Sequence, residues 1–170
     1  IQMSAEADLD AVIMRPELPL AERVLGHVSI DNALVTFDID SATVGSLAVS
    51  SGLVQVGKVL ETRLLTAHAT IEGDLPKAVN HVAALPYLPT RVSQVLSDLT
   101  TSGGVMGHLA LSVPIKGARR IPDVSTRVLI RDASLSFAGL PIELNQLAGD
   151  FVYEYPTGIT EGAIDGFFLG

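Results

Sequence analysis

The sequence contains no cysteine and no tryptophan, and it is poor in aromatic and basic side chains. Without cysteine, a disulfide framework and a zinc site built from thiolates are both excluded. Lys and Arg together number 11 against 19 Asp and Glu, which gives a net charge of −8. Nucleic-acid binding depends on clustered Lys and Arg, so we expect no nucleic-acid partner.

Long apolar runs are also lacking, although 48% of the residues are hydrophobic. Polar residues interrupt every run well before the roughly 20 consecutive apolar positions that a membrane helix needs. We therefore expect no membrane-spanning helix in these residues. The chain starts at Ile1 and stops just after Phe167-Phe168-Leu169, which suggests an internal piece of a longer protein.

Motifs that carry chemistry are absent as well. The four histidines show no close His-x-x-x-His spacing, and three of them fall on the polar sides of expected strands. Ser50-Ser51-Gly52 does not form a nucleophile elbow, and Gly103-Gly104 follows an expected helix where a phosphate cradle would precede one. We expect no catalytic residue, no metal site and no cofactor, and hence a protein that is not an enzyme.

Alternation at a period of two residues dominates what is present. Apolar and polar side chains alternate over residues 3–13, 65–72, 105–113 and 124–131. Strands with one apolar and one polar face form antiparallel sheets. The pattern predicts a mainly β fold.

One segment departs from this pattern and predicts a helical hairpin over residues 74–103. Asp74 and Thr90 are suitable helix caps, apolar residues follow each at helical spacing, and the Pro86–Pro89 stretch separates the two helices. The predicted α+β fold is an elongated, curved antiparallel sheet of roughly eight to ten strands that forms an apolar groove. The hairpin is expected to pack at one end or edge of this sheet.

An internal repeat is suggested by matches at an offset of 100 residues. Val28, Ile30, Ala33 and Phe37 recur as Val128, Ile130, Ala133 and Phe137. Chance resemblance between two amphipathic strands is the alternative, because alternation alone forces many matches. The repeat divides the chain into a first repeat at 1–73, the hairpin at 74–103 and a truncated second repeat at 104–170, and it implies further units in the parent protein.

Small side chains are frequent on the apolar sides of the expected strands. Ala5, Ala7, Ala67 and Ala69 leave space above the sheet that a packed core would fill with larger residues. This space suits a guest hydrocarbon chain. The alternative is that large residues from a facing layer of protein fill it.

The run Leu85-Pro86-Tyr87-Leu88-Pro89, the strand-like Leu109–Lys116 and the ending Ile164–Gly170 resemble a known family. They are similar to the AsmA-like proteins of the bacterial envelope, particularly the very large YhdP-type, TamB-related members. The resemblance implies a periplasmic protein anchored in the inner membrane by parts outside these residues. It also implies a curled β-groove that conducts phospholipid toward the outer membrane.

The expected function is therefore phospholipid transport, with acyl chains bound along the groove and the rest of the same polypeptide as a further partner. The alternative is a structural or interaction β-domain of an envelope protein without lipid cargo. The residues expected to line the groove are Ala5, Ala7, Leu9, Ala67, Ala69, Ile71, Leu109, Leu111, Val128, Ile130, Leu135, Phe137, Phe151 and Ile164.

Overall fold

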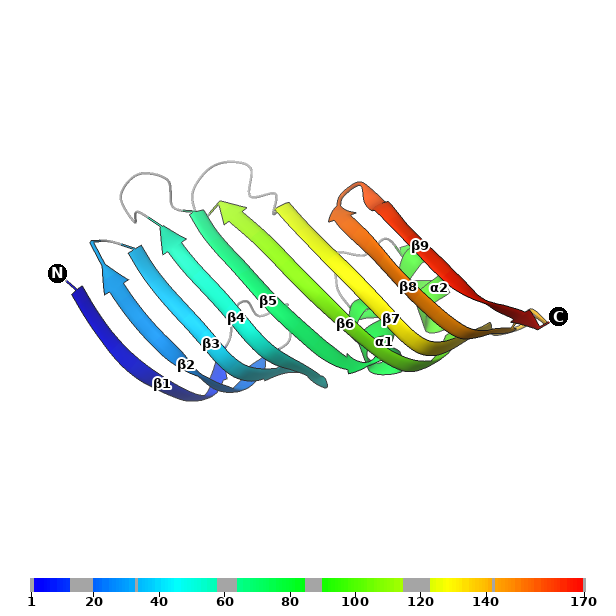
Figure 1. Ribbon diagram of the computed structural model, residues 1–170, viewed down its shortest axis with the longest axis horizontal. Helices are drawn as coiled ribbons and strands as arrows, with labels where there is room; N and C mark the ends of the chain where they lie inside the picture. Colours follow the sequence, from blue (N-terminus) through cyan, green and yellow to red (C-terminus); the bar gives the residue numbers. More distant parts are fainter. Residues whose placement is uncertain are drawn as a thin grey trace.

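The computed structural model describes residues 2–12, 20–32, 34–57, 64–84, 90–114, 123–141 and 143–169. Within these ranges the chain forms one nine-stranded sheet and two helices (Figure 1). The strands are β1 (Gln2–Val12), β2 (Ala21–Asp31), β3 (Leu34–Val44), β4 (Leu47–Gly57), β5 (Leu64–Asp74), β6 (Leu99–Pro114), β7 (Asp123–Phe137), β8 (Glu143–Tyr155) and β9 (Gly158–Leu169).

The sheet is a simple meander in which each strand pairs antiparallel with its neighbours in sequence, from β1 to β9. Because β1 and β9 lie at opposite edges, the sheet stays open and the chain ends lie far apart along its longest axis (Figure 1). The predicted elongated, curved antiparallel sheet is confirmed, and so is its approximate number of strands. The period-two alternation produced this outcome, since it gives every strand one apolar and one polar side.

The pairing registers shift at several places along the strands. Shifts occur between Glu22 and Leu25 in β2, near Gly103 in β6, and around Asp132 and Gln146 in β7 and β8. Arg23, Asp132 and Gln146 have positive φ angles, as does Gly103, which is the conformation that β-bulges use. Bulges of this kind bend a strand and raise its twist, so they account for the curl of the sheet.

A first apolar cluster lies at the bend of β1–β5. Its buried members are Ala21, Val24, Ala42 and Val49, and Phe37, Ile39, Val44 and Ile71 are among the residues that pack against them. Residues from both sides of the register shift in β2 meet in this cluster. Ala21 lies before the shift, whereas Ile39 pairs with Gly26 after it. The apolar face of the sheet therefore lies on the inside of the curl.

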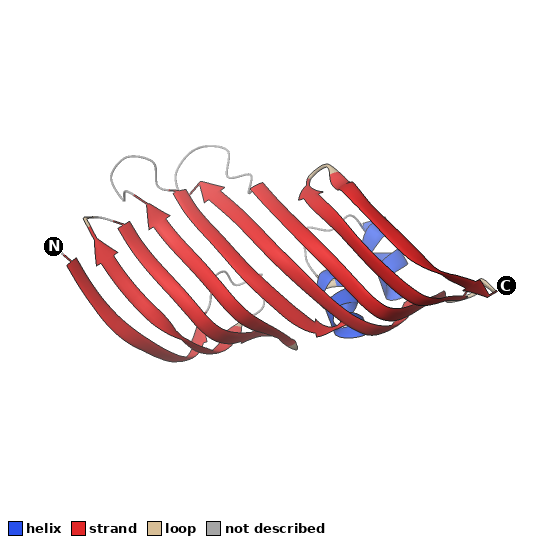
Figure 2. Ribbon diagram, viewed as in Figure 1, coloured by secondary structure: helices blue, strands red, loops and turns tan. Residues whose placement is uncertain are grey.

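The two helices, α1 (Leu75–Ala83) and α2 (Thr90–Ser97), pack against each other and against the sheet (Figure 2). Helix α1 contacts β5 and β6, and α2 contacts β6. Leu75 is the only buried helical residue in the described chain, and it packs with Ala133 and Leu147 in a second apolar cluster. The hairpin thus covers the end of the apolar face in this half, as expected. The expected helical segment reaches Gly103, whereas β6 already begins at Leu99, because residues 99–102 pair with β7.

The segments matched by the proposed repeat occupy different places in the sheet. Val28 and Ile30 lie in β2 and Phe37 in β3, whereas the matching residues 128–137 all lie in β7. Asn32 and Asp132, at equivalent positions, both have positive φ, but the chain turns at Asn32 and continues as a bulged strand at Asp132. The repeat stays a prediction. Ala33 and the Pro86–Pro89 break lie outside the described residues.

Candidate functional site

The candidate site is the apolar face on the inside of the curl. Directly paired residues of an antiparallel sheet point to the same face, so the strand registers trace rows of side chains across the sheet. The first row consists of Ala7, Gly26, Ile39, Gly52, Ala69, Leu109, Thr126, Tyr153 and Ile159. The second row consists of Ala5, Val28, Phe37, Val54, Ala67, Leu111, Val124 and Tyr155.

All residues expected to line a groove lie on this one face. Ala5, Ala7, Ala67, Ala69, Leu109 and Leu111 belong to the two rows, and Leu9 pairs with Val24 of the first cluster. A third row of paired residues contains Ile71, Gly107, Val128 and Phe151. A fourth row contains Ile130, Gly149 and Ile164. Leu135 packs with the second cluster, and Phe137 lies two residues further along β7 on the same side.

These residues do not share one environment. Ile130 and Leu135 pack against the second cluster, so α1 lies next to them. Ala69 and Ile71 pack against the first cluster, at the bend. Leu9 and Ile164 are 40% and 55% exposed, which leaves them open to solvent near the two sheet edges. The residues expected to line a groove therefore divide into some that pack within the protein and some that are open to solvent.

Several residues of the same rows were missed by sequence reasoning. Gly26 and Gly52 belong to the first row, and like the alanines of that row they leave the sheet surface in β1–β5 without large side chains. Phe37 and Val54 belong to the neighbouring second row. A side chain at Gly26 would place its Cβ 2.1 Å from the carbonyl oxygen of Asp38, so the backbones approach closely here and exclude any larger residue. Alternation in residues 24–30, 35–39 and 52–56 is the signal that would have found these positions.

The opposite face carries the polar and charged groups. Arg127 Nε donates a hydrogen bond of 2.8 Å to Asp150 Oδ1, and a second bond from its terminal nitrogen completes a two-point contact. This hydrogen bond lowers the pKa of Asp150 below its ordinary value and raises that of Arg127. His27 Nδ1 lies 3.4 Å from Asp40 Oδ2, and Glu6 lies further away.

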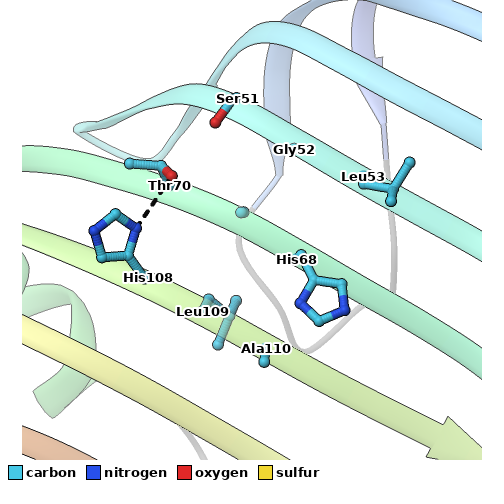
Figure 3. A pocket seen from close by; sticks show the side chains of 9 residues that line it. Ser51, Gly52, Leu53, His68, Thr70, His108, Leu109 and Ala110 are labelled. Carbon is cyan, nitrogen blue, oxygen red and sulfur yellow. Dashed lines mark hydrogen bonds between the residues drawn. The ribbon is translucent and has the colours of Figure 1, made fainter.

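A shallow depression lies over β4–β6 (Figure 3). His68, Thr70 and His108 are among the residues that line it, and the Thr70 hydroxyl lies 3.3 Å from His108 Nδ1. Across the described ranges, no three His, Cys, Asp or Glu side chains gather where they could hold a metal ion. The polar groups of this face form isolated pairs on a wet surface.

No protein family, curated protein or solved structure matches the chain. Neither helix among the described residues is long and apolar enough to cross a membrane. The geometry of the site is that of an open, curled sheet with an apolar face inside the curl and the charged groups on the opposite face.

Proposed function

We propose that this chain is a lipid-conducting module that holds acyl chains on the apolar face inside its curl. The observation that carries the proposal is the pair of rows defined above, in which every residue is glycine or apolar except three hydroxyl residues. Neither row contains Lys, Arg, Asp or Glu. Apolar surface of this extent in water favours coverage by an apolar partner.

The energetics of such a guest are adequate. Burying about 14 methylene groups of an acyl chain at about 0.8 kcal/mol each contributes about 11 kcal/mol before the entropy cost of binding is subtracted. The low floor formed by Ala5, Ala7, Ala67 and Ala69 provides room for the chain. Binding therefore needs no charged clamp.

The dimensions also suit this guest. Nine strands at about 4.8 Å spacing give a track of about 38 Å across the sheet. A bilayer core of about 30 Å holds two layers of lipid, so one chain extends about 15 Å. A continuous apolar floor without a deep well lets a chain shift along the sheet while the headgroup stays in water at the rim.

The resemblance to AsmA-like proteins supports a location in the periplasm, as part of a protein anchored in the inner membrane by segments elsewhere. It also supports a non-enzymatic role in moving phospholipid toward the outer membrane. In the alternative, the same face closes against another protein layer. The observation that favours this alternative is that α1 already covers part of the face with protein side chains.

Native mass spectrometry of the chain purified from bacterial membranes tests the proposal. We expect masses that exceed the 17.9 kDa chain by one or two phospholipids, released on mild activation. A face that binds protein instead would yield lipid-free dimers or complexes, and lipid-free monomer with a solvent-exposed apolar face would also contradict the proposal.

A further inference from the structure

The two rows of the apolar face contain polar atoms at one place. Thr126 of β7 and Tyr153 of β8 are direct cross-strand partners in the first row, and Tyr155 lies beside Val124 in the second. All other members of both rows are Gly, Ala, Val, Leu, Ile or Phe. The three hydroxyl groups therefore form a small polar patch on two neighbouring strands of an otherwise apolar face.

These hydroxyl groups are available to a guest. Among the described residues none of the three has a hydrogen-bond partner, and no partly or fully buried side-chain oxygen is left enclosed without one. The hydroxyl oxygens of Thr126 and Tyr153 therefore reach the open space over the sheet. Tyr155, which is 40% exposed, ends β8 at the rim.

The neighbouring residues define which guest atoms would meet the patch. Leu109 precedes Thr126 in the first row, and Val128 and Phe151 form the next row toward the bend. Further along β7, Ile130 and Leu135 pack against the cluster beneath α1. A lipid in this half would therefore lay its chain on the apolar residues and bring its polar end to the hydroxyl groups.

The chemistry of the patch selects an uncharged acceptor. Hydroxyl groups donate single neutral hydrogen bonds, whereas phosphate is typically held by Arg or Lys, which both rows lack. Resting on the proposed function, we infer that Thr126, Tyr153 and Tyr155 form a subsite for the ester carbonyl groups of an acyl-ester glycerolipid. The subsite would set where such a lipid pauses along the track.

The test compares two lipids that differ only in these carbonyl groups. Dioctanoylphosphatidylcholine and its dioctyl ether analogue, both kept monomeric, are titrated into the full chain by calorimetry. We expect the ester lipid to bind about five-fold more tightly per hydrogen bond formed. The combined variant Thr126→Val, Tyr153→Phe and Tyr155→Phe removes all three hydroxyl groups and keeps the side-chain shapes. It should remove this preference while still binding both lipids.

Ser125→Ala is the matched control, because Ser125 is adjacent to Thr126 but points to the polar face with Ala110 and Glu154. It should leave the ester preference intact. Equal affinity of the wild-type chain for both lipids, or a preference that survives in the combined variant, would overturn the subsite while leaving the proposed function standing. Failure of the wild-type chain to bind either lipid would overturn both.

Discussion

The β1–β5 and β6–β8 halves of the sheet bury the same kind of apolar face in different ways. In β1–β5 the sheet bends on itself, and the described members of the first cluster are all strand residues, led by Val24 at 2% exposure. In β6–β8 the helix α1 brings Leu75 onto Ala133 and Leu147. In the first half part of the face is open to solvent, as at Leu9, whereas the second half closes part of its face with α1.

This difference shows what an open apolar face needs. Where α1 lies, its side chains cover the apolar face as a bound lipid would elsewhere, and Ala133 is only 1% exposed. Ala67, a chemically identical residue on the same face, remains partly exposed. Identical substitutions in the two environments should therefore have different consequences.

The largest contrast is expected between Leu135→Asp and Leu109→Asp. An ionised carboxylate at Leu135 would lose hydration within the second cluster, and we expect a loss of about 3 kcal/mol of stability with release of α1. At Leu109 the carboxylate stays hydrated, so we expect a loss of about 1 kcal/mol or less and a preserved fold. Chemical denaturation measures both effects.

Lipid photocrosslinking completes this comparison, since Leu109→Asp should abolish crosslinking while the fold persists. Unfolding by both variants to the same extent would mean that Leu109 belongs to a closed core. Crosslinking that is unchanged in Leu109→Asp would contradict the assignment of Leu109 to the lipid track.

Enlarging an alanine gives a smaller contrast. Ala133→Phe would overfill the second cluster and should cost about 2 kcal/mol. Ala67→Phe projects into open space, so its thermal midpoint should stay near that of the wild type, while the lipid load seen by native mass spectrometry falls because the ring occupies the floor. Equal destabilisation by the two variants would show that protein already fills the space above Ala67.

The smallest effect concerns the polar face, where Arg127 lowers the pKa of Asp150. Because the folded-state pKa is lowered, the ionised Asp150 carboxylate stabilises the fold at pH values above its unfolded-state pKa of about 3.9. This contribution is lost as the pH falls through the folded-state pKa. Wild type should therefore lose slightly more thermal stability than Asp150→Asn on acidification below about pH 4. The effect is small because both groups are exposed, and lipid binding should not change.

Parallel melting curves of wild type and Asp150→Asn across this acidic range would contradict a contribution from the ion pair. A loss of lipid binding in Asp150→Asn would contradict the separation of the two faces.

Alternation made the strands and their shared apolar face predictable from the sequence, and a break in the alternation with helix caps and helical spacing made the hairpin predictable. Alternation placed Ala7, Leu109 and Phe151 on one side because antiparallel registers preserve the period of two. The bends were not predictable, since they depend on bulges at Arg23 and Asp132, whose residue types do not require a positive φ.

Which part of the apolar face α1 covers could not be predicted from the sequence either. Leu109 and Leu135 follow the same pattern, but only the packing of α1 distinguishes them. The Thr126 and Tyr153 patch was missed because it arises from the pairing of two strands, and neither residue is unusual in its own segment.

Site-specific photocrosslinking on one strand tests the central claim most directly. Leu109 and Ala110 are consecutive in β6 and pair with Ala69 and His68, so they lie on opposite faces. A photoreactive phenylalanine analogue placed at Leu109 should crosslink to phospholipid in bacterial cells, whereas the same group at Ala110 should not. Lipid adducts of equal yield at both positions, or at neither, would contradict the account.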